Sequence, residues 1–282
     1  MMKKINDIIG DAKTIGIAGH LRPDGDCMGS CMSLYNYLKK NRPDLDVRVF
    51  LEFVDKKFNI IENTDQIITT GYDGTKFDLF ISLDTASLDR LGLNLPFYEN
   101  AKRTACIDHH ASNDGYADYN YILPKASSAS EVLYDLLDED LIDKSIAEPM
   151  YMGIAHDSGV FRFQSTTPKT MRIAANMIEK GVNVNMILEE TFFRKTYNQM
   201  MVTAKIQSEA VLALDGKCIY GYCTSEMMEE YGVTTKDLDA VAASIRNVDG
   251  VEVAMFLYQL SEDSYKVSLR SKNYVDVSKD CR

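Results

Sequence analysis

Tryptophan is absent from the sequence, and cysteine, proline and histidine are scarce, with six, six and four residues among 282. No two cysteines have the C-x-x-C spacing of a structural zinc site or a redox motif. Most cysteines lie within apolar patterns. This predicts reduced, buried thiols in a cytoplasmic protein rather than a disulfide framework.

Long hydrophobic runs are also missing. No stretch approaches the roughly eighteen apolar residues that a transmembrane helix needs. Residues 1–7 carry Lys3 and Lys4 and lack the apolar segment of a signal peptide. We therefore expect no membrane partner.

Positive charge is in deficit: 31 Lys and Arg against 42 Asp and Glu give a net charge of −11. A long nucleic-acid track needs a basic stripe to neutralise phosphates, so this balance argues against one. A short anionic substrate stays compatible, because bound divalent cations reverse the charge of an acidic pocket. Any phosphorylated substrate is therefore expected to be small.

Apolar runs at residues 14–18, 47–51, 77–83 and 103–107 alternate with helical patterns in the first two thirds of the chain. This alternation predicts an α/β fold with a doubly wound, mainly parallel sheet. A smaller α+β domain is expected after it. We expect a first domain at residues 1–190, a linker at 191–200 and a second domain at 201–282, in which helices are predicted at 199–214 and 235–246 and strands at 217–222, 251–258 and 265–270.

The motif G-H-x-x-P-D-G-D-x-x-G-S at residues 19–30 links the first strand to the helix after it. It places His20, Asp24 and Asp26 in a turn punctuated by proline and glycine, which favours a metal-binding loop at the carboxyl end of a strand. The alternative is a turn followed by an Asp that caps the helix.

Acidic and imidazole side chains also follow later strands or helices: Asp84, the run Asp108-His109-His110, and His156-Asp157. Together with His20 in the first motif, these positions hold all four histidines of the chain. Since parallel strands end at one edge of a sheet, these groups are expected to converge. His156 is expected to be a structural residue or one that supports a ligand, because Asp157 already supplies a ligand there. The candidate ligands are His20, Asp24, Asp26, Asp84, His109 and Asp157.

Carboxylates outnumber imidazoles in this set, which suits Mn²⁺ or Mg²⁺ better than structural zinc. Six ligands are too many for one catalytic ion with open positions. They suit two ions about 3.5–4 Å apart that share a carboxylate, as in phosphoryl displacement.

The motifs G-H-x-x-P-D-G-D-x-x-G-S, L-D-T, D-H-H and G-I-x-x-D-S-G-x-F, in this order, resemble the DHH phosphoesterase superfamily. The closest resemblance is to its DHHA1 branch of oligoribonucleases (nanoRNases) and 3′-phosphoadenosine-5′-phosphate (pAp) phosphatases. The resemblance implies two Mn²⁺ ions per chain, with Mg²⁺ as the other candidate, and short RNA or nucleotide phosphates as partners. It leaves a homodimer open.

The resemblance also implies a role for each matched residue. His20, Asp24 and Asp84 would hold one ion; Asp26, Asp84, His109 and Asp157 would hold the other, with Asp84 as the bridge. His110 would face the scissile phosphate, and Asp108 would orient a neighbouring imidazole.

Substrate-binding residues are expected in two places. Arg270, in the segment S-L-R-S, would hold a substrate phosphate; the alternative is a solvent-facing arginine. Asn113 is the other candidate, with a role in a turn as the alternative.

The family pattern continues into a G-G-G-H-x-x-A-A-G segment, whereas the sequence ends at Asp280-Cys281-Arg282. We therefore expect an incomplete DHHA1-like domain with altered substrate binding. Two other functions stay open: a manganese pyrophosphatase, although no S-R-K-K-Q-like segment is found, and a non-catalytic nucleotide-binding protein.

Overall fold

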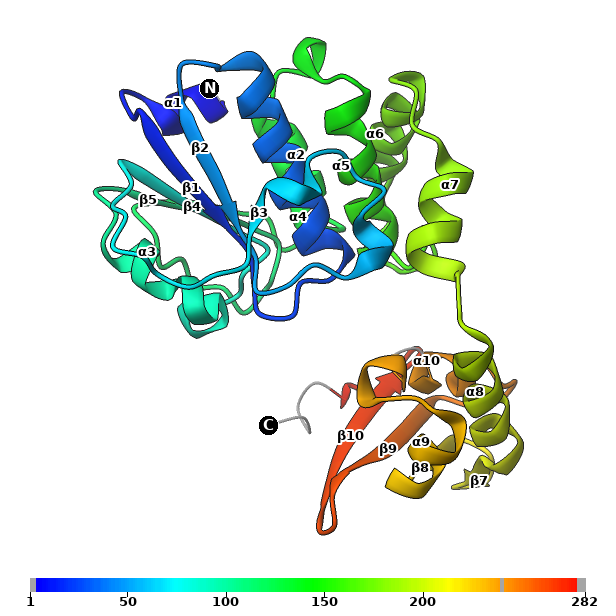
Figure 1. Ribbon diagram of the computed structural model, residues 1–282. Helices are drawn as coiled ribbons and strands as arrows, with labels where there is room; N and C mark the ends of the chain where they lie inside the picture. Colours follow the sequence, from blue (N-terminus) through cyan, green and yellow to red (C-terminus); the bar gives the residue numbers. More distant parts are fainter. Residues whose placement is uncertain (1–3, 239–240, 278–282) are drawn as a thin grey trace. The chain divides into compact units, whose positions relative to one another are not determined.

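The computed structural model describes residues 4–238 and 241–277. Between Arg194 and Lys195 the chain divides into two compact units, each with its own sheet (Figure 1). The expected linker at 191–200 spans this division. Regular structure occupies most of that interval, because a π-helix runs to Phe193 and helix α8 begins at Tyr197.

The first unit contains a six-stranded sheet in the order β3-β2-β1-β4-β5-β6. Every neighbouring pair in it is parallel. The strands of the α/β fold are therefore wound outward in both directions from the centre. They are β1 (Thr14–Ala18), β2 (Asp46–Phe50), β3 (Ile67–Ile68), β4 (Leu79–Leu83), β5 (Thr104–Asp108) and β6 (Tyr119–Ile122).

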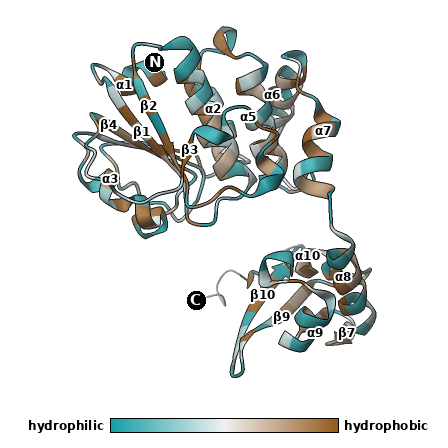
Figure 2. Ribbon diagram, viewed as in Figure 1, coloured by the Kyte–Doolittle hydropathy of each residue, from teal (hydrophilic) through white to brown (hydrophobic). Residues whose placement is uncertain are grey.

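Helices cover both faces of this sheet, as the near-continuous apolar strands require. A large core of buried aliphatic side chains lies on the face covered by α2, α4 and α5, and a smaller core with four phenylalanines lies on the face covered by α3. Figure 2 shows hydrophobic colours along β1 and β4. The α-helices of this unit are α1 (Ile5–Ile9), α2 (Gly25–Asn41), α3 (Leu95–Glu99), α4 (Ala129–Leu136), α5 (Lys144–Asp157), α6 (Pro168–Glu179) and α7 (Val184–Leu188). Short 3₁₀ turns lie at Lys56–Phe58, Thr64–Gln66, Leu88–Asn94 and Glu139–Leu141, and the π-helix is Glu189–Phe193.

The winding direction reverses at the centre of the sheet. From β1 the chain passes through α2 to β2 on one side, and the later strand β4 pairs with β1 on the other side. Such a reversal leaves a crevice at the carboxyl ends of the two central strands, where ligands of open α/β sheets bind. The loops that follow β1, β4 and β5 meet at this edge.

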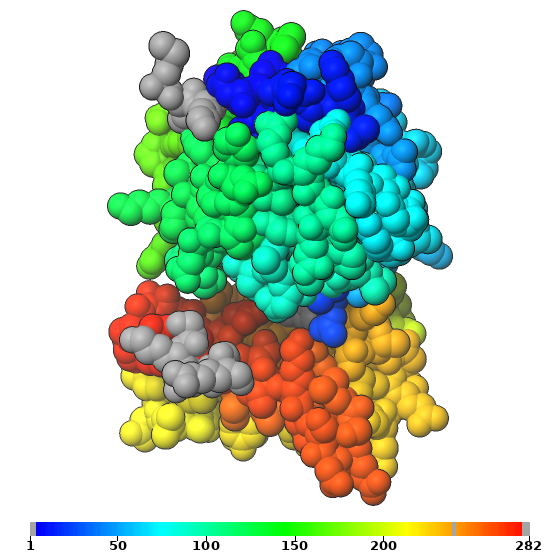
Figure 3. All heavy atoms as spheres, turned by 90° about the vertical axis from the view of Figure 1, so that its left-hand side faces the viewer, coloured from blue at the N-terminus to red at the C-terminus, as the bar shows by residue number. Residues whose placement is uncertain are grey.

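The second unit contains a mixed four-stranded sheet in the order β10-β9-β8-β7. Its core forms between that sheet and helices α8, α9 and α10. Strands β9 and β10 form a hairpin, and Figure 3 shows them, in orange to red, at the surface of this unit. The elements are α8 (Tyr197–Glu209), β7 (Val211–Ala213), β8 (Cys218–Cys223), α9 (Ser225–Tyr231), a 3₁₀ turn (Thr235–Leu238), α10 (Val241–Arg246), β9 (Val253–Ser261) and β10 (Ser264–Ser271).

The predicted fold class is confirmed, and the differences concern short elements. Strands β3 and β6 were not predicted, because they are short and half-buried at the edges of the sheet. The helix expected at 199–214 is wrong at its end: α8 stops at Glu209, and residues 211–213 pair with β8 as β7. Helix α9 was also missed. Residues 239–240, inside the helix expected at 235–246, and Asp280-Cys281-Arg282 lie outside the described residues.

The described part of the chain has no candidate membrane span and no disulfide bond. None of its helices is both long and apolar enough to cross a membrane. Its five cysteines are free thiols, four of them buried.

Candidate metal centre

His20 lies just beyond the carboxyl end of β1, with 6% of its surface exposed. Its Nδ1 donates a hydrogen bond to the carbonyl oxygen of Leu21 over 2.7 Å, because a carbonyl can only accept. When the imidazole is neutral, as a metal ligand must be, its lone pair is therefore on Nε2. That atom lies 3.4 Å from Oδ2 of Asp84 and 3.8 Å from Oδ1 of Asp24. The ring is therefore oriented as a metal ligand.

Asp24 is placed both to cap helix α2 and to bind a metal, the two roles that the sequence left open for the first loop. Its Oδ1 accepts hydrogen bonds from the backbone N–H groups of Asp26 and Cys27, so it caps helix α2. The same carboxylate faces His20, and its side chain stays 61% exposed. Hydrogen bonds and the nearby imidazole outweigh burial and hold the pKa of Asp24 below its usual range. An N-cap and a metal ligand are thus compatible here.

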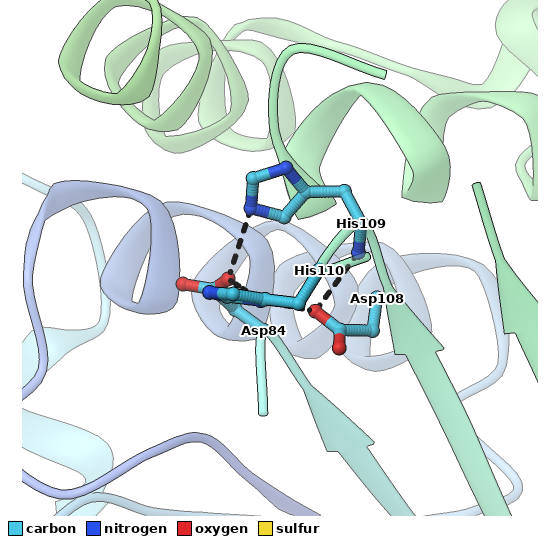
Figure 4. A group of neighbouring side chains, drawn as sticks. All are labelled: Asp84, Asp108, His109 and His110. Atoms are coloured by element: carbon cyan, nitrogen blue, oxygen red, sulfur yellow. Dashed lines mark hydrogen bonds and ion pairs between the residues drawn. The ribbon is translucent and has the colours of Figure 1, made fainter. Parts of the chain in front are cut away.

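Asp84 stands at the centre of the cluster (Figure 4). It follows β4 with φ of +52°, a left-handed conformation that is uncommon outside glycine and recurs at functional sites. Its side chain is buried, and Oδ1 meets no hydrogen-bond donor among the described residues. Oδ2 faces His20 at 3.4 Å, whereas Oδ1 faces Nε2 of His109 at 3.4 Å. One carboxylate therefore spans two imidazoles from different strand ends.

A second group surrounds His109, which follows β5. Its Nε2 lies 3.3 Å from Oδ2 of Asp157, at the end of α5, and 3.9 Å from Oδ2 of Asp26, at the start of α2. Burial alone would lower the pKa of His109, but the carboxylates of Asp84, Asp26 and Asp157 raise it to about 10. Burial raises the pKa of Asp157 to about 6 and also raises the pKa of Asp26. Such mutual perturbation of pKa values is typical of functional sites.

Asp108 and His110 form a hydrogen-bonded pair beside this group. Nδ1 of His110 donates to Oδ1 of Asp108 over 2.8 Å, and Asp108 is fully buried. This hydrogen bond, which outweighs burial, raises the pKa of His110. Burial alone would raise the pKa of Asp108, but the bonds from His110 and Asn113 lower it. The ring of His110 is therefore fixed through Nδ1, and 38% of its side chain is exposed.

Asn113, a predicted substrate-binding residue, contacts Asp108 and the loops around it. Its side-chain NH₂ donates to Oδ2 of Asp108 at 2.6 Å and to the carbonyl of Thr85, and its Oδ1 accepts from the N–H of Gly115. The side chain is buried, and both ends of its amide are occupied. The alternative, a role in the turn, describes these contacts.

The side chains present fit divalent cations. The side chains form three groups, and within each group the ligand atoms all lie within 4.8 Å of one another. The groups are His20, Cys27 and Asp84; Asp26, His109 and Asp157; and Asp84, Asp108, His109 and His110. The unpartnered, buried Oδ1 of Asp84 is an orphaned acceptor, which a cation would satisfy. Five of the six predicted ligands belong to these groups; Asp24 does not, but its Oδ1 lies 3.8 Å from Nε2 of His20.

Two neighbours complete the cluster. His156 is structural, as expected: its Nε2 donates to the hydroxyl of Thr191 at 2.8 Å, because that hydroxyl gives its own hydrogen to Ile187. Burial lowers the pKa of His156 to about 4. Cys27 was missed. Its position on the same helical turn as Asp24 and Asp26 was the available signal, but its apolar pattern indicated only burial.

Arg270 lies in the second unit, on the exposed strand β10. It lines a hollow of about 270 Å³ together with Tyr258 and Lys266. Its Nη1 donates to the carbonyl of Leu269 at 2.9 Å, so most of the guanidinium donors remain available.

Carboxylates and imidazoles thus gather at the switch point of a parallel sheet, which defines this protein as an α/β protein with a candidate metal centre. A family model described as "DHH family, N-terminal domain" matches residues 14–154, half of the chain. The chain therefore belongs to the DHH family.

Two relatives are similar over nearly the whole chain. The "Bifunctional oligoribonuclease and PAP phosphatase NrnA" of Thermus thermophilus is 30% identical over 271 residues, covering 93% of this chain and 77% of the relative. The protein of the same name from Bacillus subtilis is 26% identical over 267 residues, covering 93% and 82%. The family resemblance predicted from the motifs is confirmed.

Solved structures support the fold. An exopolyphosphatase-related protein from Bacteroides fragilis has a TM-score of 0.84 at 22% identity, covering 93% of this chain and 80% of that one. A putative family II inorganic pyrophosphatase from Methanococcus jannaschii has a TM-score of 0.51 at 15% identity, covering 92% and 88%. At these identities the likeness concerns the fold alone.

Proposed function

We propose that this chain is a two-metal phosphoesterase that hydrolyses short oligoribonucleotides and nucleotides of the 3′-phosphoadenosine-5′-phosphate type. One observation carries the proposal: Oδ2 of Asp84 faces His20 and Oδ1 of Asp84 faces His109, each at 3.4 Å. A carboxylate between two imidazoles that arrive from separate strands is suited to bridge two ions.

The ligands divide between the two ions as the family resemblance implies. Asp84 belongs to both sets, and Mn²⁺ is the proposed metal, with Mg²⁺ as the alternative. When bound, such ions acidify water and neutralise charge on phosphoryl oxygens. One set is His20, Asp24 and Asp84, and the other is Asp26, Asp84, His109 and Asp157.

His110 would act directly on the substrate. Asp108 holds the imidazole through Nδ1 and favours its protonated form, so the half-exposed Nε2 carries a hydrogen that it can donate to a phosphoryl oxygen. Asn113 fixes Asp108 from the other side. Asp108 and Asn113 thus position the group that meets the phosphate.

The proposed substrate class rests on the named activities of the relatives and on charge. A chain of net charge −11 has little basic surface for a long strand, whereas a few phosphates need only the metal centre and one or two cations. Arg270 is the proposed phosphate partner in the second unit. A cytoplasmic location remains a prediction from the sequence, and a homodimer stays open.

Hydrolysis of a trinucleotide, of 3′-phosphoadenosine-5′-phosphate and of pyrophosphate tests the proposal. Turnover of the first two is expected to stop in chelator, to return with Mn²⁺, and to fall at least about 100-fold in Asp84→Asn, because the shared ligand is lost. Asp89→Asn, an exposed acid outside the cluster, is the control. An unchanged rate in Asp84→Asn would remove the bridge, and preferential hydrolysis of pyrophosphate would favour the pyrophosphatase alternative. Nucleotide binding without turnover would favour a non-catalytic role.

A further inference from the structure

Asp26 is held by an element that supplies no ligand of its own. Its Oδ2 accepts the backbone N–H of Ala129 at 2.6 Å, and its Oδ1 accepts the N–H and the hydroxyl of Ser130 at 3.0 and 2.6 Å. These donors belong to the first turn of α4, more than a hundred residues along the chain. Asp26 is 1% exposed, and burying an anion is costly unless donors of this kind compensate.

The start of α4 is itself anchored. The hydroxyl of Ser128 accepts the N–H of Glu131 and caps the helix. The carboxylate of Glu131 accepts the N–H and hydroxyl of Ser127 and the hydroxyl of Thr170, at the start of α6. All of these side chains are buried. These hydrogen bonds therefore fix the first turn of α4, which carries the donors to Asp26.

Close packing by α5 removes the remaining freedom. A Cβ added to Gly153 would lie 2.1 Å from Oγ of Ser130 and 2.7 Å from Oδ1 of Asp26. Only a glycine on α5 permits this approach, and it confines both side chains. Asp26 and Asp24 thus differ, since Asp24 accepts N–H groups of the turn that it caps, faces His20 at 3.8 Å and is largely exposed.

We propose that Ser130 is a positioning residue of the metal centre, which, with the first N–H groups of α4, fixes the carboxylate of Asp26 toward His109. The inference rests on the proposed function, in that the centre takes two divalent cations. Ser130 touches neither substrate nor ion; it acts through Asp26. Loss of its hydroxyl should loosen one of the two ion sites and leave the other as it is.

Mn²⁺ binding to the full chain, followed by calorimetry and electron paramagnetic resonance, tests this. In Ser130→Ala one binding step is expected to weaken by about 10–100-fold, the usual cost of losing a group that orients a ligand, while the step that uses His20 and Asp24 is unchanged. Ser33→Ala is the matched control: Ser33 is equally buried on α2, but its hydroxyl donates to the carbonyls of Gly29 and Ile146. Both steps should persist there.

Two steps of unchanged affinity in Ser130→Ala would overturn the inference, and so would equal weakening of both steps. Should Ser130→Ala fail to fold, Thr170→Val removes one donor to Glu131 without changing the volume much, and a smaller, few-fold weakening of the same step is expected. If Thr170→Val bound both Mn²⁺ ions with wild-type affinity, that result would then count against the inference about Ser130. A chain that binds two ions but hydrolyses nothing would refute the proposed function and leave the role of Ser130 standing.

Discussion

A Cβ atom on Gly25 would lie 2.1 Å from Cγ of His156, so the first residue of α2 can only be glycine while that ring occupies its place. The ring is fixed by its hydrogen bond to Thr191 and by an edge contact with Phe192, whose ring centroid lies 5.2 Å away. Asp24 and Asp26 flank Gly25. The packing of His156 therefore determines how closely α5 approaches the loop that carries two of the predicted ligands.

Gly25→Ala should destabilise the protein by about 1–3 kcal/mol, the usual cost of overpacking a buried contact. Thermal or urea unfolding of the metal-free protein measures the loss. Gly71→Ala is the control, because a Cβ there would meet its nearest neighbour, Cβ of Leu93, at an ordinary 3.7 Å. Equal stability of the two variants would show that the ring moves aside at little cost.

The sheet could be predicted from the sequence because its central strands are buried on both faces and read as continuous apolar runs. The same reasoning failed where tertiary contacts decide the structure. Residues 211–213 continue a helical pattern, yet they pair with β8. Strand β3 has two residues, too few for any periodicity.

The metal cluster was predictable because each of its acids and imidazoles lies at the end of an element whose direction the parallel sheet dictates. What sequence reasoning missed are the groups that orient these ligands. Ser130 donates to Asp26 from 104 residues away, and no local pattern marks such a contact. Asn113 is polar and sits in a turn, so a substrate contact and a bond to Asp108 are equally compatible with its sequence position.

Mn²⁺ binding should release protons. His109, with a pKa raised to about 10, and His20, with a pKa raised to about 12, are protonated in the metal-free protein at pH 7.5, but a ligand must offer a bare Nε2. About two protons should therefore leave per chain. Since protons compete with the metal, affinity should rise by about 100-fold per pH unit near pH 8.

Calorimetry in two buffers of different ionisation enthalpy counts these protons. His109→Gln should release about one proton fewer, since only His20 remains to be deprotonated. Metal binding without proton release would show that these imidazoles are not ligands.

Asp108→Asn should lower the pKa of His110 toward its ordinary value, because the hydrogen bond to the Asp108 carboxylate is the main cause of the upward shift. If protonated His110 meets the phosphate, the alkaline limb of the pH–rate profile should move to lower pH, and kcat should fall by about 10–100-fold. Imidazole NMR titration of the metal-free protein measures the pKa directly.

The control for that variant is Asp118→Asn, an exposed acid whose carboxylate accepts from Thr104 outside the cluster. Its pH–rate profile should match that of the wild type. A profile of Asp108→Asn that keeps its alkaline limb would exclude His110 as the acid.

Arg270→Ala should raise KM for a trinucleotide about tenfold with little change in kcat, because a charge-assisted contact to a phosphate remote from the reacting bond contributes to ground-state and transition-state binding alike. A phosphate contact is supported by the positions of two cations on β10. Alternate residues of a strand point to the same face, so Lys266 and Arg270 share a face with Ser268, and all three line the same hollow. Lys205→Ala, a lysine on α8 paired with Glu209, is the matched loss of charge in the same unit. Steady-state kinetics on both variants tests whether Arg270 binds a substrate phosphate. An equal effect of the two substitutions would show that Arg270 is only a solvent-facing charge. A fall in kcat at constant KM would show that its contact forms only in the transition state.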